Sequence, residues 1–233
     1  GSLFVKGTDP EVKAAVESAA RLLADLGHDV EEARPAFDRE RLVRAYLTQI
    51  AAGVAAEIDD MSRWTGRKPA ASYFEPTTWF LCQIGRKLSA ADLQLARDAA
   101  QAAGRELAAF FARYDLLVTP TLAYPPVRLG ELGLKGVEKA ALAVLRAVPV
   151  GAALRAVLGQ LADNSLERTP NTQLFNQTGQ PAVSLPLDQT ADGLPVGIQF
   201  AARHAEDALL VRVASQIEEA RPWKDRRPRI VAP

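Results

Sequence analysis

Five side-chain amides lie close together in residues 171–180, directly before two apolar segments. They are Asn171, Gln173, Asn176, Gln177 and Gln180. A carboxamide both donates and accepts hydrogen bonds, and leaving a buried one unpaired costs about 1–3 kcal/mol. The amides therefore either satisfy the backbone of neighbouring loops or face a polar ligand such as an amide, and the sequence favours neither reading over the other.

Few residues are suited to act as a nucleophile or a base. Histidine occurs only at His28 and His204, and we expect both to be solvated surface residues rather than general bases. Cys82 is the only cysteine. It lies in an apolar segment and is expected to be a small buried side chain, because a nucleophilic thiol needs a neighbouring base or cation.

Several standard sites are excluded by the motifs that the chain lacks. It contains no G-x-S-x-G elbow, no phosphate-binding glycine loop and no H-E-x-x-H pair. A single cysteine also excludes an intrachain disulfide and a cysteine-cluster metal site. We therefore expect no metal and no cofactor.

The composition is that of an ordinary globular protein without net charge. Of the 233 residues, 48% are apolar and 24% charged, and the formal net charge is zero. A neutral chain has no long-range attraction for nucleic acid or an acidic membrane, so we expect neither as a partner. No apolar run approaches the ~20 residues that span a bilayer. The single cysteine favours a reducing cytoplasm, and the excess of arginine over lysine is typical of GC-rich bacteria.

Periodicity and turn signals predict an α/β fold in which helices cover a mixed sheet fragment. Asp9 and Pro10 favour the start of a first helix, which Gly27 ends. Strands are expected over residues 115–119, 182–187 and 196–201, the last two paired antiparallel, and residues 28–33 are expected to form a short strand or edge segment. Further helices are expected over residues 39–61, 77–87, 89–114, 137–161, 170–178 and 206–220. With no clear linker, we predict one domain over residues 1–233.

The same segments resemble amidase-signature enzymes. Residues 171–187 (NTQLFNQTGQPAVSLPL) resemble the end of that family's catalytic domain, and residues 193–200 (GLPVGIQF) follow in family order. Residues 9–12, 26–30 and 114–121 (YDLLVTPT) match earlier segments, so the resemblance covers nearly the whole chain. Within the family, the chain resembles the bacterial amidases known as 6-aminohexanoate cyclic dimer hydrolases.

The resemblance implies amide hydrolysis by a serine nucleophile, a second serine joined by a cis peptide, and a lysine base. The glycine- and serine-rich segment around the two serines precedes the region matched here. A serine attacks at neutral pH only when a partner takes its proton. Five serines each lack such glycine neighbours: Ser62, Ser89, Ser165, Ser184 and Ser215. No catalytic residue is therefore carried over to this chain.

The chain is accordingly expected to be the C-terminal half of an amidase, inactive by itself. The start Gly1-Ser2 reads as a tag remnant on an excised piece. Its partners would be a small-molecule amide in the full-length protein and the missing N-terminal catalytic half. An uncovered sheet edge and apolar face would favour self-association.

By analogy with the family, five residues are candidates for the wall of the substrate pocket: Trp79, Cys82, Thr119, Phe175 and Asn176. Trp79 and Phe175 are equally compatible with the core, and residues 137–161 are a natural place for substrate selectivity. Two alternatives stay open. The chain is a non-catalytic amidase-like subunit that pairs with another chain, or it is an independent enzyme that uses Cys82 or His204.

Overall fold

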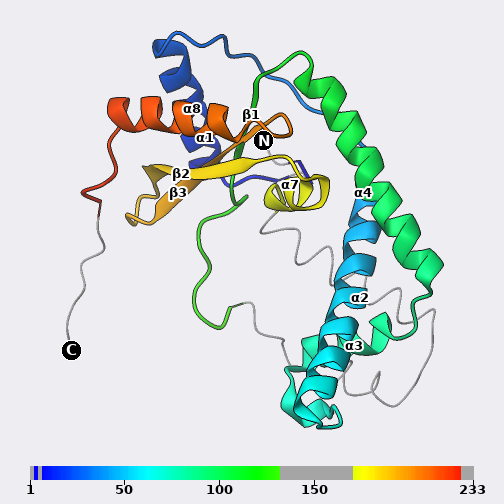
Figure 1. Ribbon diagram of the computed structural model, residues 1–233. Coiled ribbons are helices and arrows are strands. Elements are labelled where there is room, and N and C mark those ends of the chain that lie inside the picture. Colours follow the sequence, from blue (N-terminus) through cyan, green and yellow to red (C-terminus); the bar gives the residue numbers. More distant parts are fainter. Residues whose placement is uncertain (1–2, 5–6, 132–169, 227–233) are drawn as a thin grey trace, which may run out of the picture. The chain divides into compact units, whose positions relative to one another are not determined.

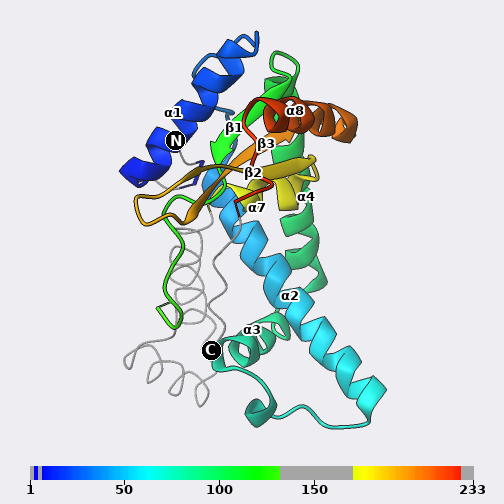
Figure 2. The same ribbon diagram turned by 90° about the vertical axis from the view of Figure 1, so that its left-hand side faces the viewer.

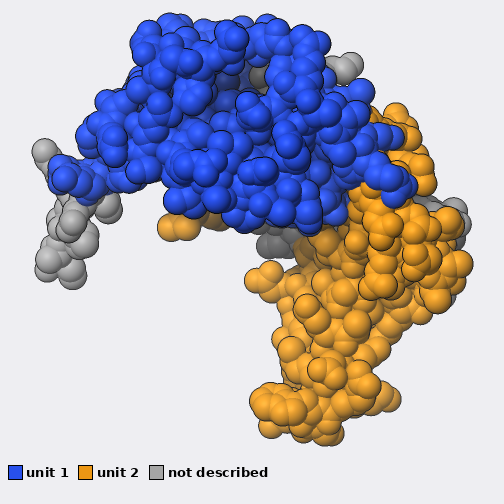
Figure 3. Space-filling view, turned by 45° about the horizontal axis from the view of Figure 1, so that its top comes forward, with its two compact units in different colours: residues 1–36, 104–126, 166–233 blue, residues 37–103, 127–165 orange. Residues whose placement is uncertain are grey.

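The computed structural model describes residues 3–4, 7–131 and 170–226. The chain divides into two compact units, coloured separately in Figure 3. Unit 1 comprises Gly1–Ala36, Gly104–Pro126 and Leu166–Pro233, and unit 2 comprises Phe37–Ala103 and Val127–Ser165. The assignment of a single domain to residues 1–233 stays a prediction.

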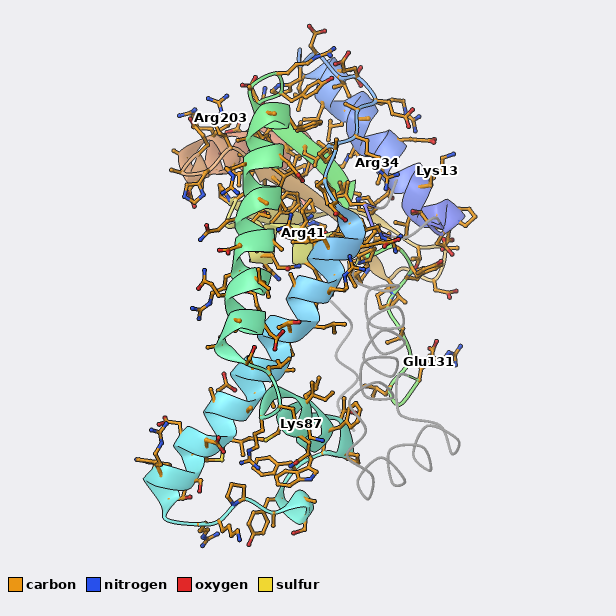
Figure 4. The ribbon with its side chains drawn as sticks, turned by 90° about the vertical axis from the view of Figure 1, so that its right-hand side faces the viewer. Lys13, Arg34, Arg41, Lys87, Glu131 and Arg203 are labelled. Carbon is orange, nitrogen blue, oxygen red and sulfur yellow. The ribbon has the colours of Figure 1, made fainter. Side chains whose placement is uncertain are left out.

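The first helix of unit 1, α1, spans Pro10–Asp25 and begins as its sequence predicts. Asp9 is the N-cap and its Oδ1 accepts a hydrogen bond from Glu11 N at 2.9 Å. Proline fits the next position because the first amide of a helix has no partner within it. Lys13 projects from the outer side of α1 (Figure 4) and lies 3.9 Å from Glu17. The inner side carries Val12, Ala15, Ala19 and Leu23.

A three-stranded sheet forms the centre of unit 1 (Figure 1). Its strands are β1 (Leu116–Pro120), β2 (Ala182–Gln189) and β3 (Pro195–Ala202), in the order β1-β3-β2. Both pairings are antiparallel, so the predicted β2–β3 hairpin is confirmed. Gly193, with φ of 79°, donates to Thr190 O at 2.8 Å in the turn. The α/β prediction is also confirmed, and the described sheet is antiparallel throughout.

One face of the sheet is apolar and is covered by α1 and by α8 (Asp207–Ala220). Figure 2 shows both helices beside the strands. Alternate residues of β3 enter this core, since successive side chains of a strand point to opposite faces. The core residues of the sheet are Leu185, Leu187, Val196, Ile198, Phe200 and Ala202, and those of α8 are Leu210, Val213 and Ile217. We call this the apolar face.

The opposite face of the sheet adjoins α7 (Thr172–Thr178). This short helix ends at Gly179, whose φ is 80° and whose N–H donates to Phe175 O at 2.8 Å. Helix α4 (Ala90–Phe111) approaches it closely, because a Cβ added to Gly104 would lie 3.6 Å from Thr178 O. The glycine and the αL helix end thus fix the position of α7.

Unit 2 contains α2 (Arg39–Thr65), the 3-10 turn η1 (Ala71–Tyr73) and α3 (Pro76–Gly85). Asp38 caps α2 through Arg41 N at 2.9 Å, and Gly66, with φ of 66°, ends it. Helices α2 and α3 pack so closely that a Cβ on Gly85 would lie 1.9 Å from Ala51 O. Helix α2 runs to Thr65, four residues beyond its predicted end, and Gly66 is its C-cap.

Two segments, residues 28–33 and 137–161, do not match a described strand or helix. Residues 28–33 were expected to form a strand but are extended chain without strand pairing. Glu31 instead accepts from Arg113 Nη2 at 3.0 Å and contacts the Tyr114 hydroxyl. A strand is defined by its partner, and this segment has none among the described strands. The helix expected over residues 137–161 lies outside the described residues.

A polar sheet face as candidate functional site

A row of polar side chains crosses the sheet on the face opposite the apolar core. The strand register places Ser184 beside Gln199 and Gln199 beside Thr119. Thr119 and Gln199 are buried, at 2% and 4% exposure. Gln199 Nε2 donates to Thr119 Oγ1 at 3.2 Å and approaches Asn171 O at 3.4 Å. We call this row, with the residues bonded to it, the polar face.

Asn171 anchors the start of α7 to the polar face. It is fully buried, and its Nδ2 donates to Pro120 O at 2.6 Å. Its Oδ1 accepts from Leu3 N at 2.7 Å, and Leu3 O in turn accepts from Arg34 Nη2 at 2.9 Å. Arg34 lies on the segment that follows α1 (Figure 4). One of the amides singled out in the sequence therefore satisfies loop backbone.

An exposed pair of hydroxyls lies next to this row. Thr121 Oγ1 and Ser184 Oγ are 2.6 Å apart. Gly197 leaves room for them, since a Cβ at that position would lie 2.7 Å from Ser184 Oγ and 2.9 Å from Thr121 Oγ1. The neighbour of the Ser184 hydroxyl is thus another hydroxyl, which is too weak a base to take a serine proton at neutral pH.

The sequence-predicted pocket residues of unit 1 lie on or beside the polar face. Thr119 is part of the row, and Gln199 links it to Asn171 at the start of α7. On α7, Phe175 is buried at 4% exposure, whereas Asn176 is exposed. Thr119 and Phe175 are therefore enclosed in unit 1, and Asn176 presents its amide to solvent.

The other two predicted pocket residues lie on α3 in unit 2. Trp79 is half-buried, stacks on Phe74 with ring centroids 5.9 Å apart, and has the Arg86 guanidinium carbon 5.9 Å from its ring. Arg86 also forms an ion pair with Asp59. Trp79 is therefore a partly accessible aromatic surface beside a cation.

Cys82 is fully buried and packs with Ala55 and Ile58. Burial raises the pKa of its thiol; the Arg86 charge opposes this shift and the Asp59 charge adds to it. A raised pKa lowers the fraction of thiolate, which is the nucleophilic form. The environment fits the small buried residue expected from the sequence.

Neither histidine is placed as a general base. His204 is exposed, and its Nδ1 donates to Gly179 O at 3.0 Å, which ties it to the end of α7. His28 was expected to be solvated but is half-buried, with Nε2 2.8 Å from Gln216 Oε1 on α8. The physical reason is that the chain folds back after Gly27 against α8.

Sequence reasoning missed Gln199, Thr121 and Ser184. A signal was available in residues 196–200, where Gly197 and Gln199 alternate with Val196, Ile198 and Phe200. Period-two alternation indicates a strand with one polar face. The pairing of Gln199 with Thr119, 80 residues apart in sequence, is not visible in that pattern.

Two properties of the described residues bear on ligand classes. Within residues 3–4, 7–131 and 170–226, no group of three or more His, Cys, Asp and Glu side chains is arranged to hold a metal ion. None of the helices in these ranges has the length and apolar character needed to cross a membrane.

The sequence matches the profile of the family described as Amidase over residues 2–211. It is 33% identical over 228 residues to a 6-aminohexanoate-cyclic-dimer hydrolase of Pseudomonas sp. (strain NK87), covering 97% of this chain and 43% of that protein. The Paenarthrobacter ureafaciens enzyme of the same name is 32% identical with the same coverage. The chain thus spans less than half the length of these curated relatives.

The fold agrees with solved structures. A 6-aminohexanoate cyclic dimer hydrolase aligns with a TM-score of 0.74 and 30% identity, covering 97% of this chain and 44% of that chain. A bacterial aryl acylamidase of the amidase signature family aligns with a TM-score of 0.71 at 20% identity, covering 95% of this chain and 42% of that chain. At that lower identity the likeness concerns the fold.

Proposed function

Because the chain belongs to the amidase family, we propose that it is the C-terminal part of a serine amidohydrolase that cleaves carbon–nitrogen amide bonds. In this proposal the chain contributes sheet and pocket wall, while the nucleophile and base come from polypeptide outside it. One observation carries the proposal: the chain spans 43% of the length of amide-hydrolysing relatives to which it is 33% and 32% identical.

The surroundings of Ser184 support the same division of labour. Ser184 is exposed on the polar face, but its hydroxyl partner is Thr121 Oγ1 at 2.6 Å. Without a base to accept its proton, a serine hydroxyl is a poor nucleophile at neutral pH. We therefore expect this polypeptide alone to leave amides intact.

The proposed pocket wall in unit 1 consists of Thr119, Phe175 and Asn176. Asn176 is exposed and carries both a donor and an acceptor, so it is suited to hold an amide group in position. On unit 2 the proposed contacts are Trp79 and Cys82, of which Trp79 offers an apolar ring for an alkyl or aromatic substituent.

The substrates proposed are neutral linear or cyclic amides. This choice rests on the name of the relatives that are 33% and 32% identical, which act on a cyclic dimer of 6-aminohexanoate. We also propose that the protein is located in the cytoplasm.

We also propose that the chain self-associates when the rest of the protein is absent. Strands β1 and β2 each pair with β3 and with no other described strand. Unpaired strand edges offer free N–H and C=O groups to another chain. Sedimentation over a wide concentration range checks this, and a strictly monomeric profile contradicts it.

The test compares this chain with the intact product of its native gene. Both proteins are purified, and release of primary amine from 6-aminohexanoate cyclic dimer and of ammonia from hexanamide is followed. We expect turnover by the intact product and none by the chain. Turnover by the chain that is lost in Ser184→Ala, Cys82→Ala or His204→Ala would favour an independent enzyme.

The same experiment separates a second candidate, a non-catalytic subunit that pairs with another chain. An intact gene product of this length, with no glycine- and serine-rich segment and no turnover, would favour that candidate and contradict the proposed function.

A further inference from the structure

Two glutamines of α7 carry buried amide atoms that have no hydrogen-bond partner among residues 3–4, 7–131 and 170–226. The atoms are Gln173 Oε1, Gln177 Nε2 and Gln177 Oε1. Gln173 is only 5% exposed, and Gln177 is half-buried although both its amide atoms are covered from solvent. Residues four apart on a helix lie on the same side, so the two amides are neighbours. Buried polar groups in native proteins are nearly always paired.

Helix α7 is too firmly held to relieve this deficit by shifting as a whole. On its other side, Leu174 and Phe175 are buried at 0% and 4% exposure. Its end is fixed by the αL conformation of Gly179, whose carbonyl accepts from His204 Nδ1 at 3.0 Å. Asn171, at its start, is bonded to Pro120 O at 2.6 Å. The positions of Gln173 and Gln177 are therefore fixed by the bonds and packing of the rest of α7.

The unpaired atoms specify the chemistry of a complementary group. Gln177 Nε2 offers hydrogen atoms, and Gln173 Oε1 and Gln177 Oε1 offer lone pairs. A carboxylate only accepts hydrogen bonds and an ammonium group only donates them, so neither satisfies both needs. A carboxamide satisfies both, because its carbonyl accepts from Gln177 Nε2 while its N–H donates to either glutamine oxygen. A hydroxyl group also donates and accepts, and the proposed function favours the carboxamide.

We infer that Gln173 and Gln177 form a binding site for a carboxamide that comes from outside this chain. The inference deepens the proposed function, on which the choice between ligand sources rests. The –CO–NH– group belongs either to a small-molecule amide or to a peptide group of the polypeptide that completes the fold. Both glutamines act as binding residues, and neither takes part in bond cleavage.

The first test measures the thermal midpoint of Gln177→Met in the 233-residue chain. Methionine keeps the unbranched shape and removes both unpaired atoms, so the midpoint is expected to rise by about 2–4 °C. Gln101→Met is the matched control, because Gln101 is an exposed glutamine on a helix; no change is expected there. Gln173→Met should shift the midpoint in the same direction as Gln177→Met. A lowered midpoint in both variants would mean that the amides are bonded within the chain, and overturns the inference.

The second test measures binding to the ¹⁵N-labelled chain by the side-chain NH₂ resonances of Gln173 and Gln177. Hexanamide represents the small-molecule source, acetyl-dialanine N-methylamide the peptide source, and methyl hexanoate is the ester control. We expect saturable shifts with an amide, and at least tenfold weaker binding for the ester and for Gln177→Met. Tighter binding of hexanamide assigns the site to substrate, and tighter binding of the peptide assigns it to the completing polypeptide.

Absence of shifts with both amides, or unchanged binding to Gln177→Met, overturns the inference. Neither readout depends on hydrolysis. The binding site can therefore fail while the intact gene product still cleaves amides, and the proposed function can fail while the glutamines still bind them.

Discussion

The two faces of the unit 1 sheet differ in how far this chain completes them. The apolar face is closed by α1 and α8, which bury Ile198 and Phe200 at 0% and 1% exposure. The polar face carries Thr119 and Gln199 in a bonded row, an exposed hydroxyl pair, and a neighbouring helix with unpaired amides. The comparison indicates that this chain closes the apolar face with its own helices, whereas the polar face keeps an exposed hydroxyl pair and amides without a partner among the described residues.

The largest expected effect comes from opening the apolar face. Phe200→Ala removes a fully buried ring and leaves a cavity, so the free energy of unfolding is expected to fall by about 3–5 kcal/mol. Urea denaturation followed by circular dichroism measures it. Val211→Ala, at a residue 69% exposed on α8, is the control and should change the value by less than about 0.5 kcal/mol. A loss below about 1 kcal/mol would show that the apolar face does not carry the stability.

The next effect comes from breaking the anchor of the polar face. Asn171→Ala leaves Pro120 O and Leu3 N without their partners, and the free energy of unfolding should fall by about 2–3 kcal/mol. Asn176→Ala, at an exposed position on α7, should leave it nearly unchanged. Equal losses in the two variants would contradict the anchoring role of Asn171.

Adding a methyl group at Gly197, beside the hydroxyl pair of Thr121 and Ser184, should have an intermediate effect. Gly197→Ala places a methyl group 2.7 Å from Ser184 Oγ, and the overpacking is expected to lower the free energy of unfolding by about 1–2 kcal/mol. Gly53→Ala is the control, because nothing lies within 4 Å of its Cβ position. In the interior of α2 that change should be stabilising by about 0.5–1 kcal/mol. The same sign in both would refute the close approach at Gly197.

The smallest effect is expected from exchanging the polar and apolar side chains of two adjacent residues of β1, Thr119 and Val118. Thr119→Val deprives Gln199 Nε2 of its 3.2 Å partner, and Val118→Thr places a hydroxyl against the apolar face. Each should lower the free energy of unfolding by about 1 kcal/mol. If either substitution proves stabilising, the two faces are less distinct than the packing indicates. Denaturant titration of both single variants and the double variant gives the comparison.

Local signals in the sequence were sufficient for most helix ends and for the hairpin. Asp9 and Pro10 mark the start of α1, and Gly179 and Gly193 occur where the chain needs a positive φ. These residues act on neighbours within a few positions, so their effect is visible in one segment. Residues 28–33 were assigned wrongly for the complementary reason, because a strand depends on a partner elsewhere in the chain.

The candidate site was less accessible to sequence reasoning. Thr119 could be selected by resemblance, but its link to Gln199 depends on a register between strands 80 residues apart. The amides of residues 171–180 looked equivalent in sequence. In the structure they separate: Asn171 is bonded to backbone, Asn176 is exposed, and Gln177 is covered without a partner. Burial and pairing, which the residue type does not encode, decide their roles.

The core of unit 1 joins the beginning of the chain to its end. Glu11 accepts from Ala191 N at 3.0 Å, and Arg221 Nη1 donates to Ser18 Oγ at 3.1 Å across 203 residues. On a ribosome that adds 5–20 residues per second, about 10–40 s pass between the synthesis of Ser18 in α1 and that of Arg221 after α8. The side of α1 that packs with α8 is uncovered during that interval.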